Sequence, residues 1–244
     1  MFDAAIEHVR KENPKKAFLL YLVDLPENDF TVTFKTVCSH YAGDPLVFPV
    51  GIGRSFYEQV LPEHSVDLGF CFSSSHWLSR HAGPLPGFAY PGHFVEDVEC
   101  RQAWVAQAQQ DGATMLNKRM LELRKGGAHL VTFFVETEGA DEGESCKRMG
   151  TFIRESLEEA GMGELEGWVN ATSFIRRPKD IEDILKSEGL EGNALEAEVL
   201  EIARIKTSKE TAGEEGVHKF AEIVANASHS AFFGSMAGRL QEVA

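Results

Sequence analysis

Three short clusters of polar and aromatic residues could carry chemistry, because each one follows an apolar, strand-like run of the chain. They are Asp24-Leu25, Ser55-Phe56, and Ser73 with His76-Trp77. In open α/β sheets the ligand crevice lies outside the carboxyl ends of the strands. Residues of these types, repeated at three strand ends, predict one binding edge.

Asp24 follows the apolar run 17–23 without a break. A carboxylate at such a strand end can accept hydrogen bonds from both hydroxyls of a ribose. The alternative is that Asp24 is a turn or cap residue, which is the commoner role of a strand-end Asp. Asp29 and Glu27 are expected to cap the helix that follows, because Asn28 or Asp29 begins its apolar periodicity.

Ser55 and Phe56 offer a hydroxyl and a flat apolar ring, and such a ring gives a base a face to lie against. Taken alone, Phe56 is better interpreted as a core residue. Gly51 and Gly53 do not form a dinucleotide loop, because Phe56 stands where the third glycine is needed.

His76 and Trp77 combine two N–H donors with a large apolar wall, and Ser73 adds a hydroxyl. A lone His-Trp pair is more often part of a core. No Ser-His-Asp set, paired carboxylates or metal-ligand cluster can be recognised, so we assign no catalytic residue and no metal site.

Four ordered segments together resemble the SABATH family of carboxyl methyltransferases, the salicylate, jasmonate and caffeine-synthase group. The family reads Asn-Asp-Leu-Pro-Gly-Asn-Asp-Phe, Gly-Ser-Phe-Tyr and Ser-Ser-Tyr-Ser-Leu-His-Trp-Leu-Ser, followed by Phe-Leu-Lys-x-Arg-x-x-Glu-Leu-x-x-Gly-Gly. The matching segments here are 24–30, 53–57, 73–79 and 116–127. The resemblance covers most of the chain and weakens across 81–100 and after Ile205.

The resemblance implies an S-adenosylmethionine cofactor and a small-molecule carboxylic acid as the acceptor. It places Asp24 on the ribose, with Leu25, Ser55 and Phe56 around the adenine. It makes Ser73 a cofactor contact. By the same resemblance His76 and Trp77 line the acceptor pocket, so Phe56 and Trp77 should border one shared cavity. No general base is needed, since a carboxylic acid with a pKa of about 4 is already ionised at neutral pH.

The chain also departs from the family. Cys71, Phe72 and Ser73 stand where the family has Ser-Ser-Tyr. The first strand, with its Asp-Leu-Gly-Cys-Ser-x-Gly-Pro-Asn loop for the methionine part of the cofactor, has no counterpart, and Met1 is expected to fall inside the next helix. One alternative is therefore a catalytically inactive fragment. Such a fragment could be a binding or dimerising remnant of the enzyme, for example a homodimer. Another is an N-methyltransferase of a small heterocycle.

The composition is ordinary for a globular protein. The 244 residues carry a net charge of −14, which argues against a nucleic-acid partner. The four cysteines have no metal-ligand spacing, so reduced thiols and a cytoplasmic location are expected. No apolar stretch reaches the length of a membrane span.

Alternating strand and helix patterns predict the elements that position these residues. Run 17–23 is apolar without alternation, which is typical of a strand buried on both faces. Gly126 and Gly127 are expected to cap the longest helix. The expected strands are 17–23, 45–50, 65–72, 128–135 and 194–205, the helices are 2–12, 28–40, 99–125, 145–160, 178–187 and 216–240, and 81–95 is a long loop.

The fold class expected from this order is α/β, with a Rossmann-like methyltransferase sheet that lacks its first strand and a helical cap. We expect residues 1–140 to form a partial cofactor-binding core and 141–193 the cap segment. Residues 194–244 should form a strand and a helix that return to the core.

Overall fold

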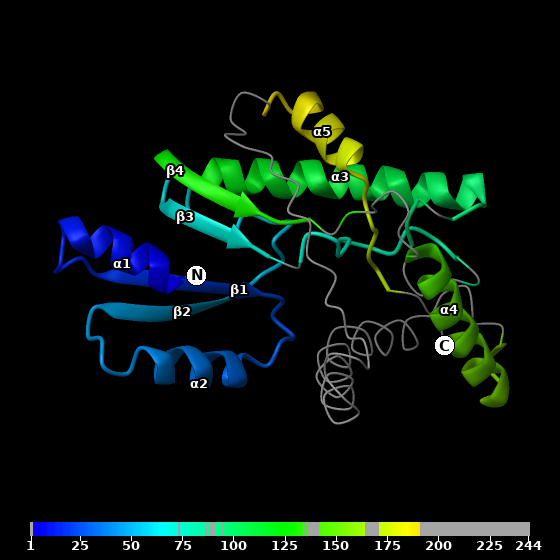
Figure 1. The fold of residues 1–244 in the computed structure, drawn as a ribbon, viewed down its shortest axis with the longest axis horizontal. Helices are drawn as coiled ribbons and strands as arrows, with labels where there is room; N and C mark the ends of the chain where they lie inside the picture. The colour runs from blue at the N-terminus through cyan, green and yellow to red at the C-terminus, as the bar shows by residue number, and fades with distance from the viewer. Residues whose placement is uncertain are drawn as a thin grey trace, which may run out of the picture. The chain divides into compact units, whose positions relative to one another are not determined.

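The computed structural model describes residues 2–72, 74–85, 87, 91–93, 95–133, 135, 142–163 and 171–190 (Figure 1). The chain divides into two compact units, which are described one at a time. The first unit is formed by Met1–Gly69 and Thr114–His129. The second is formed by Phe70–Ala113 and the described residues from Leu130 onward.

The first unit contains two parallel strands, β1 (Phe18–Asp24) and β2 (Val47–Gly53), joined through helix α2 (Phe30–His40). A crossover helix of this kind is what parallel pairing requires. Phe18 lies opposite Val47, and Asp24 lies opposite Gly53. Both strands therefore end at the same edge.

Helix α1 (Phe2–Glu12) and α2 cover the same face of this strand pair. Ile6 of α1 packs with Leu20 and Val47 in a buried cluster. A Cβ atom added at Gly51 would come within 2.8 Å of the Phe34 ring of α2. Positions 20, 47 and 51 share one face, because side chains alternate along each strand and Leu20 lies opposite residue 49.

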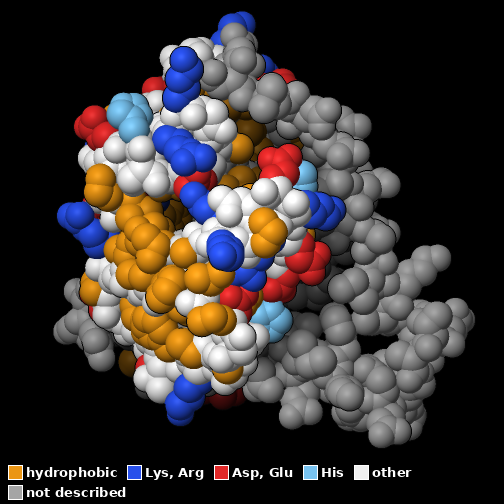
Figure 2. Space-filling view, turned by 90° about the vertical axis from the view of Figure 1, so that its left-hand side faces the viewer, with side chains coloured by type: hydrophobic (Ala, Val, Ile, Leu, Met, Phe, Trp, Pro, Cys, Tyr) orange, Lys and Arg blue, Asp and Glu red, His pale blue; other side chains and the backbone are white. Residues whose placement is uncertain are grey.

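The prediction that run 17–23 is buried on both faces is wrong for the described structure. Leu20 is buried, but Leu19 is 59% exposed and Phe48 of β2 is 48% exposed. The reason is that helices α1 and α2 cover one face only. Figure 2, a view from the left-hand side of Figure 1, shows hydrophobic side chains gathered at the surface.

The longest helix, α3 (Val98–Glu122), ends earlier than expected and leads directly into strand β4 (Leu123–Val131). Its last carbonyls already accept strand-like bonds, from the His64 N–H to Leu121 and from the Ser65 N–H to Glu122. The prediction of a Gly126-Gly127 helix cap is therefore wrong. A Cβ atom at Gly127 would lie 2.8 Å from the Val66 carbonyl oxygen, so glycine allows the close approach of β4 to its neighbour.

Strand β4 pairs with β3 (Val66–Cys71). Gly127 lies beside Val66, and the Thr132 N–H donates to the Cys71 carbonyl. Both strands therefore run in the same direction, and the pair is parallel. Within the described residues the strands form two separate two-stranded sheets, β1-β2 and β3-β4. The fold is α/β with an incomplete Rossmann-like sheet, as the sequence predicts.

The second unit is built around the segment 171–176, which bridges to three other segments. Trp77 pairs with Ser173, Gly92 with Ile175, and Val135 with Arg176. Helix α4 (Glu142–Glu159) precedes this segment and α5 (Pro178–Ser187) follows it. The predicted bounds of α5 are confirmed, and its proline stands in the first turn.

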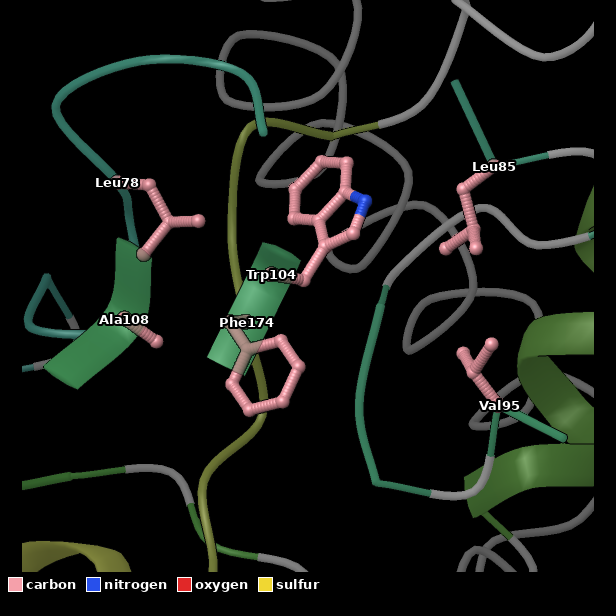
Figure 3. Close-up of a cluster of buried hydrophobic side chains, with 6 residues drawn as sticks. All are labelled: Leu78, Leu85, Val95, Trp104, Ala108 and Phe174. Atoms are coloured by element: carbon pink, nitrogen blue, oxygen red, sulfur yellow. The ribbon is translucent and has the colours of Figure 1, made fainter. Parts of the chain in front are cut away.

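The core of the second unit joins this segment to α3 and to the loop 81–95. Figure 3 shows the Trp104 indole and the Phe174 ring in the middle, with Leu78 and Ala108 on one side. Leu85 and Val95 of the loop lie on the other side. The described part of the loop contains no helix or strand, and four of its side chains are buried, His81, Leu85, Pro91 and Val95.

The predicted strand 194–205 and helix 216–240 lie outside the described residues. Among the helices of the described part, none is long and apolar enough to cross a bilayer.

Candidate functional site

Asp24 is the last residue of β1 and is exposed, as a ribose-binding carboxylate at a sheet edge should be. Its Oδ1 accepts from the Leu25 N–H at 2.8 Å, and its Oδ2 accepts from Asn28 Nδ2 at 2.7 Å. Such bonds are typical of a strand-end turn, which is the alternative role of Asp24. Each carboxylate oxygen keeps a further lone pair, so the ribose contact of Asp24 stays a prediction, as does the adenine contact of Leu25, which is 50% exposed.

Asp29 caps helix α2, as predicted. Its side chain accepts from the Thr31 N–H at 2.8 Å. Hydrogen bonds from Thr31 hold the pKa of Asp29 below its ordinary value. The carboxylate of Asp29 is therefore occupied by the helix start, whereas Asp24 stands one turn earlier at the strand end.

Ser55 and Phe56 follow the end of β2, next to Asp24. The Arg54 N–H donates to the Asp24 carbonyl at 2.8 Å, which continues the strand pairing by one bond. The Ser55 hydroxyl accepts from the Tyr57 N–H at 3.2 Å, and the rings of Phe56 and Tyr57 lie with centroids 4.5 Å apart. Sequence and structure thus agree that the two predicted adenosine-binding segments share one sheet edge.

The segment 54–61 is anchored from behind by Glu122, the last residue of α3. Glu122 is 2% exposed, and its Oε1 accepts from the N–H groups of Val60 at 2.6 Å and Leu61 at 3.1 Å. Arg119 donates to the same oxygen at 2.8 Å. Glu122 had no predicted role, although its place in the motif 116–127 was a signal.

His76 and Trp77 belong to the second unit, where backbone bonds to segment 171–176 fix them. The Phe174 N–H donates to the His76 carbonyl at 2.8 Å, and the Leu78 N–H donates to the Thr172 carbonyl at 2.7 Å. The two aromatic rings have centroids 4.9 Å apart. Their spacing and half-buried positions suit a wall that presents both side chains together.

Behind this wall lies Arg176, which is 1% exposed. Its Nη1 donates to the Ser75 carbonyl at 2.7 Å and its Nη2 to the Ala108 carbonyl of α3 at 2.8 Å. The Ser75 hydroxyl donates to the Thr132 carbonyl at 2.6 Å. The residue that precedes His76 is therefore held by two other parts of the unit.

Burial, and secondarily the charge of Arg176, lower the pKa of His76 to about 4. At neutral pH the imidazole is uncharged, with one nitrogen as donor and the other as acceptor. It can therefore offer a hydrogen bond to an anion without an ion pair.

Asp111 of α3 holds the other end of the wall. It is 4% exposed, and it accepts from the Ser79 N–H at 2.8 Å, from the Ser79 hydroxyl at 2.7 Å and from Gln107 Nε2 at 2.9 Å. Segment 75–79 is thus fixed at both ends, and neither Asp111 nor Arg176 was singled out from the sequence.

Like the predicted ligand contacts of the other site residues, two further predictions stay untested. Ser73 lies outside the described residues. Phe56 belongs to the first unit and Trp77 to the second, so a cavity shared by their rings remains an expectation.

The fold and these segments define a Rossmann-like α/β protein with candidate ligand residues at the carboxyl ends of its strands. The family described as SAM dependent carboxyl methyltransferase matches residues 2–233, and the chain belongs to this family. S-adenosylmethionine is the cofactor of the family.

Individual relatives agree with this assignment. Methyltransferase FUS9 of Gibberella fujikuroi is 32% identical over 134 residues, which are 52% of this chain and 35% of that protein. Indole-3-acetate O-methyltransferase 1 of Oryza sativa subsp. japonica is 25% identical over 210 residues, 70% of this chain and 50% of that protein. The chain thus spans half or less of the length of these two relatives.

A solved structure, "Loganic acid methyltransferase with SAH", superposes with a TM-score of 0.66 at 19% identity. The match covers 77% of this chain and 56% of that one. It confirms the methyltransferase fold.

Proposed function

We propose that this chain carries the cofactor-binding and acceptor-binding segments of an S-adenosylmethionine-dependent methyltransferase that acts on the carboxylate of a small-molecule acid. The observation that carries the proposal is the placement of Asp24 and Ser55 side by side at the carboxyl edge of β1 and β2, in a chain of this family. The names of the rice relative and of the solved structure, an indole-3-acetate and a loganic acid methyltransferase, support an acid as the acceptor class.

In the cofactor half, Asp24 would accept from the ribose hydroxyls, and Leu25, Ser55 and Phe56 would border the adenine. The exposed position of Asp24 supports this role, because its carboxylate meets solvent while its Oδ1 and Oδ2 retain acceptor capacity. Ser73 would add a cofactor contact.

In the acceptor half, Trp77 would supply an apolar wall and an indole N–H, and neutral His76 a second donor. Neutral donors suit carboxyl methylation for a reason of charge. The acid begins as an anion and ends as a neutral ester, so its charge is partly lost in the transition state. A cationic partner would stabilise the ground state more than the transition state and would slow the transfer.

The transfer itself needs alignment more than proton chemistry. The ionised acid attacks the methyl carbon of the sulfonium, and S-adenosylhomocysteine leaves as a neutral thioether. The contribution of the protein is to hold oxygen, carbon and sulfur in line and to exclude water from the nucleophile.

The two halves can be tested separately with the 244-residue chain. Calorimetry measures the binding of adenosine, which tests the first unit. Ligand NMR tests the second unit by comparing the binding of small aromatic and alkyl acids with that of their carboxamides. We expect weak adenosine binding and a preference for acid over amide. Trp77→Phe keeps the wall and removes the N–H, so it should weaken acid binding by about 1 kcal/mol, roughly fivefold.

Turnover is read in parallel by transfer of a labelled methyl group to the acids. We expect none from residues 1–244 alone, because the family segment that would hold the methionine carboxylate and ammonium is not in the sequence. Loss of each charge-assisted bond costs about 1.5–3 kcal/mol. Turnover would exclude the alternative of an inactive fragment. A preference for neutral heterocycles over acids would favour N-methylation. Failure to bind any acid would overturn the proposal.

A further inference from the structure

The described residues contain one deeply buried cation in contact with the acceptor segment, Arg176. Burial of a guanidinium is unfavourable unless its donors are satisfied. Here the planar group donates to two backbone carbonyls from different parts of the unit, at Ser75 and Ala108, and it lies 5.7 Å from the centroid of the Phe133 ring.

These contacts join three elements around one side chain. Ser75 immediately precedes His76, Ala108 lies on α3, and Arg176 is paired with Val135 through a β-bridge. Arg176 also follows closely on Phe174, whose N–H donates to the His76 carbonyl. The peptide groups on both sides of the His76 Cα are thereby fixed, one by the side chain of Arg176 and one by the backbone of its own segment.

We propose that Arg176 is a positioning residue of the acceptor site, which anchors the His76–Trp77 wall from behind and holds a buried positive charge that acts on the His76 imidazole. The assignment of this wall to an acid acceptor rests on the proposed function, whereas the coupling between Arg176 and His76 does not. A lysine could supply the charge, but it could not bond both carbonyls with the fixed geometry of a guanidinium.

The charge of Arg176 adds to the effect of burial on the His76 imidazole. Burial, and secondarily Arg176, lower the pKa of His76 to about 4, so the imidazole does not become a cation at physiological pH. Two other carboxylates on the packed elements, Asp111 and Asp180, have partners of their own. Asp111 accepts from Ser79, and Asp180 accepts from His93 Nε2 at 2.6 Å and from the Arg177 N–H at 2.6 Å.

The experiment compares Arg176→Lys and Arg176→Met with Arg177→Met, which removes a cation from the adjacent position. The His76 ring signals are followed by NMR from pH 3.5 to 8 without any ligand, and they are assigned among the nine histidines with His76→Gln. In Arg176→Met the pKa of His76 should rise measurably toward its ordinary value. In Arg176→Lys it should stay low, and in Arg177→Met it should not change.

Positioning is read from the amide shifts of Ser75, His76 and Trp77 and from the dissociation constant of the best acid. Arg176→Lys should move these shifts and weaken acid binding about fivefold, while Arg177→Met should leave both unchanged. A folded Arg176→Met protein with an unaltered His76 titration would overturn the charge coupling.

If Arg176→Met does not fold, Arg176→Lys decides the proposal. Unchanged shifts and unchanged acid affinity in that variant would overturn the positioning role. If the wild-type protein binds no acid but the titrations and amide shifts behave as expected, the proposed function fails while the coupling of Arg176 to His76 stands.

Discussion

The two candidate ligand segments, 54–61 in the first unit and 74–79 in the second, are anchored by buried charged side chains of opposite sign. Glu122 accepts from the N–H groups of Val60 and Leu61, whereas Arg176 donates to the carbonyls of Ser75 and Ala108. In both cases the buried charged side chain bonds the backbone of the segment.

The difference lies in the residues that would meet a ligand. Asp24 is exposed, and its carboxylate bonds within its own turn. His76 is largely buried, and its pKa is set by burial and by Arg176. The candidate acceptor segment is thus held in place before a ligand arrives, whereas the candidate cofactor edge is an open strand end. Preorganisation reduces the cost of ordering on binding.

The largest expected effect is the loss of the anchor in the first unit. Glu122→Ala would leave the Val60 and Leu61 N–H groups without their acceptor and would remove the carboxylate that faces Arg119, which keeps its bond to the Glu58 carbonyl. We expect this change to cost about 3–5 kcal/mol of the free energy of unfolding. Urea unfolding measures the loss, and hydrogen exchange at the Val60 and Leu61 amides locates it. Exposed Glu63→Ala is the control, and an equally small effect of both changes would contradict the anchoring role.

A smaller effect is expected from two histidines, one in each unit. At pH 5 each should lower the free energy of unfolding by about 2 kcal/mol relative to neutral pH. Burial lowers the pKa of both His76 and His129 to about 4, with Arg176 and Arg119 as the respective second causes. The unfolded chain binds these protons at a pKa of about 6.5. Stability is therefore full above that pH and falls as the pH drops toward 4.

His76→Gln and His129→Gln test this expectation by urea unfolding at pH 7 and pH 5. Each variant should lose roughly 2 kcal/mol less than the wild-type protein between the two pH values. Exposed His8→Gln should follow the wild type. If His76→Gln or His129→Gln loses as much stability between pH 7 and pH 5 as the wild-type protein does, the histidine concerned does not control acid stability.

An effect of similar size, on binding instead of stability, is expected at the open edge. Asp24→Ala should weaken adenosine binding by about 1–3 kcal/mol, the range for a hydrogen bond to a charged group. Asn28→Ala removes only the side chain that occupies Oδ2, so it should leave adenosine binding unchanged or stronger. Calorimetry measures both, and unchanged binding in Asp24→Ala would remove this residue from the site.

The sequence by itself determined the features that depend on neighbouring residues. Asp29 caps α2, Pro178 opens α5, and the polar residues follow the ends of β1 and β2 as predicted. Caps, proline positions and the order of strands are local signals, because the groups that interact lie within a few residues of one another. The family motifs have the same local character, and they sufficed to assign the family.

Only the tertiary structure decided which side chains hold these segments and which faces are covered. Arg176 bonds a carbonyl 101 residues away, and Glu122 bonds an N–H group 62 residues away. Leu19 is exposed because α1 and α2 share one face, and Gly127 serves a strand contact with Val66 instead of a helix cap. Such partners depend on how distant parts of the chain pack, which no local pattern of residues encodes.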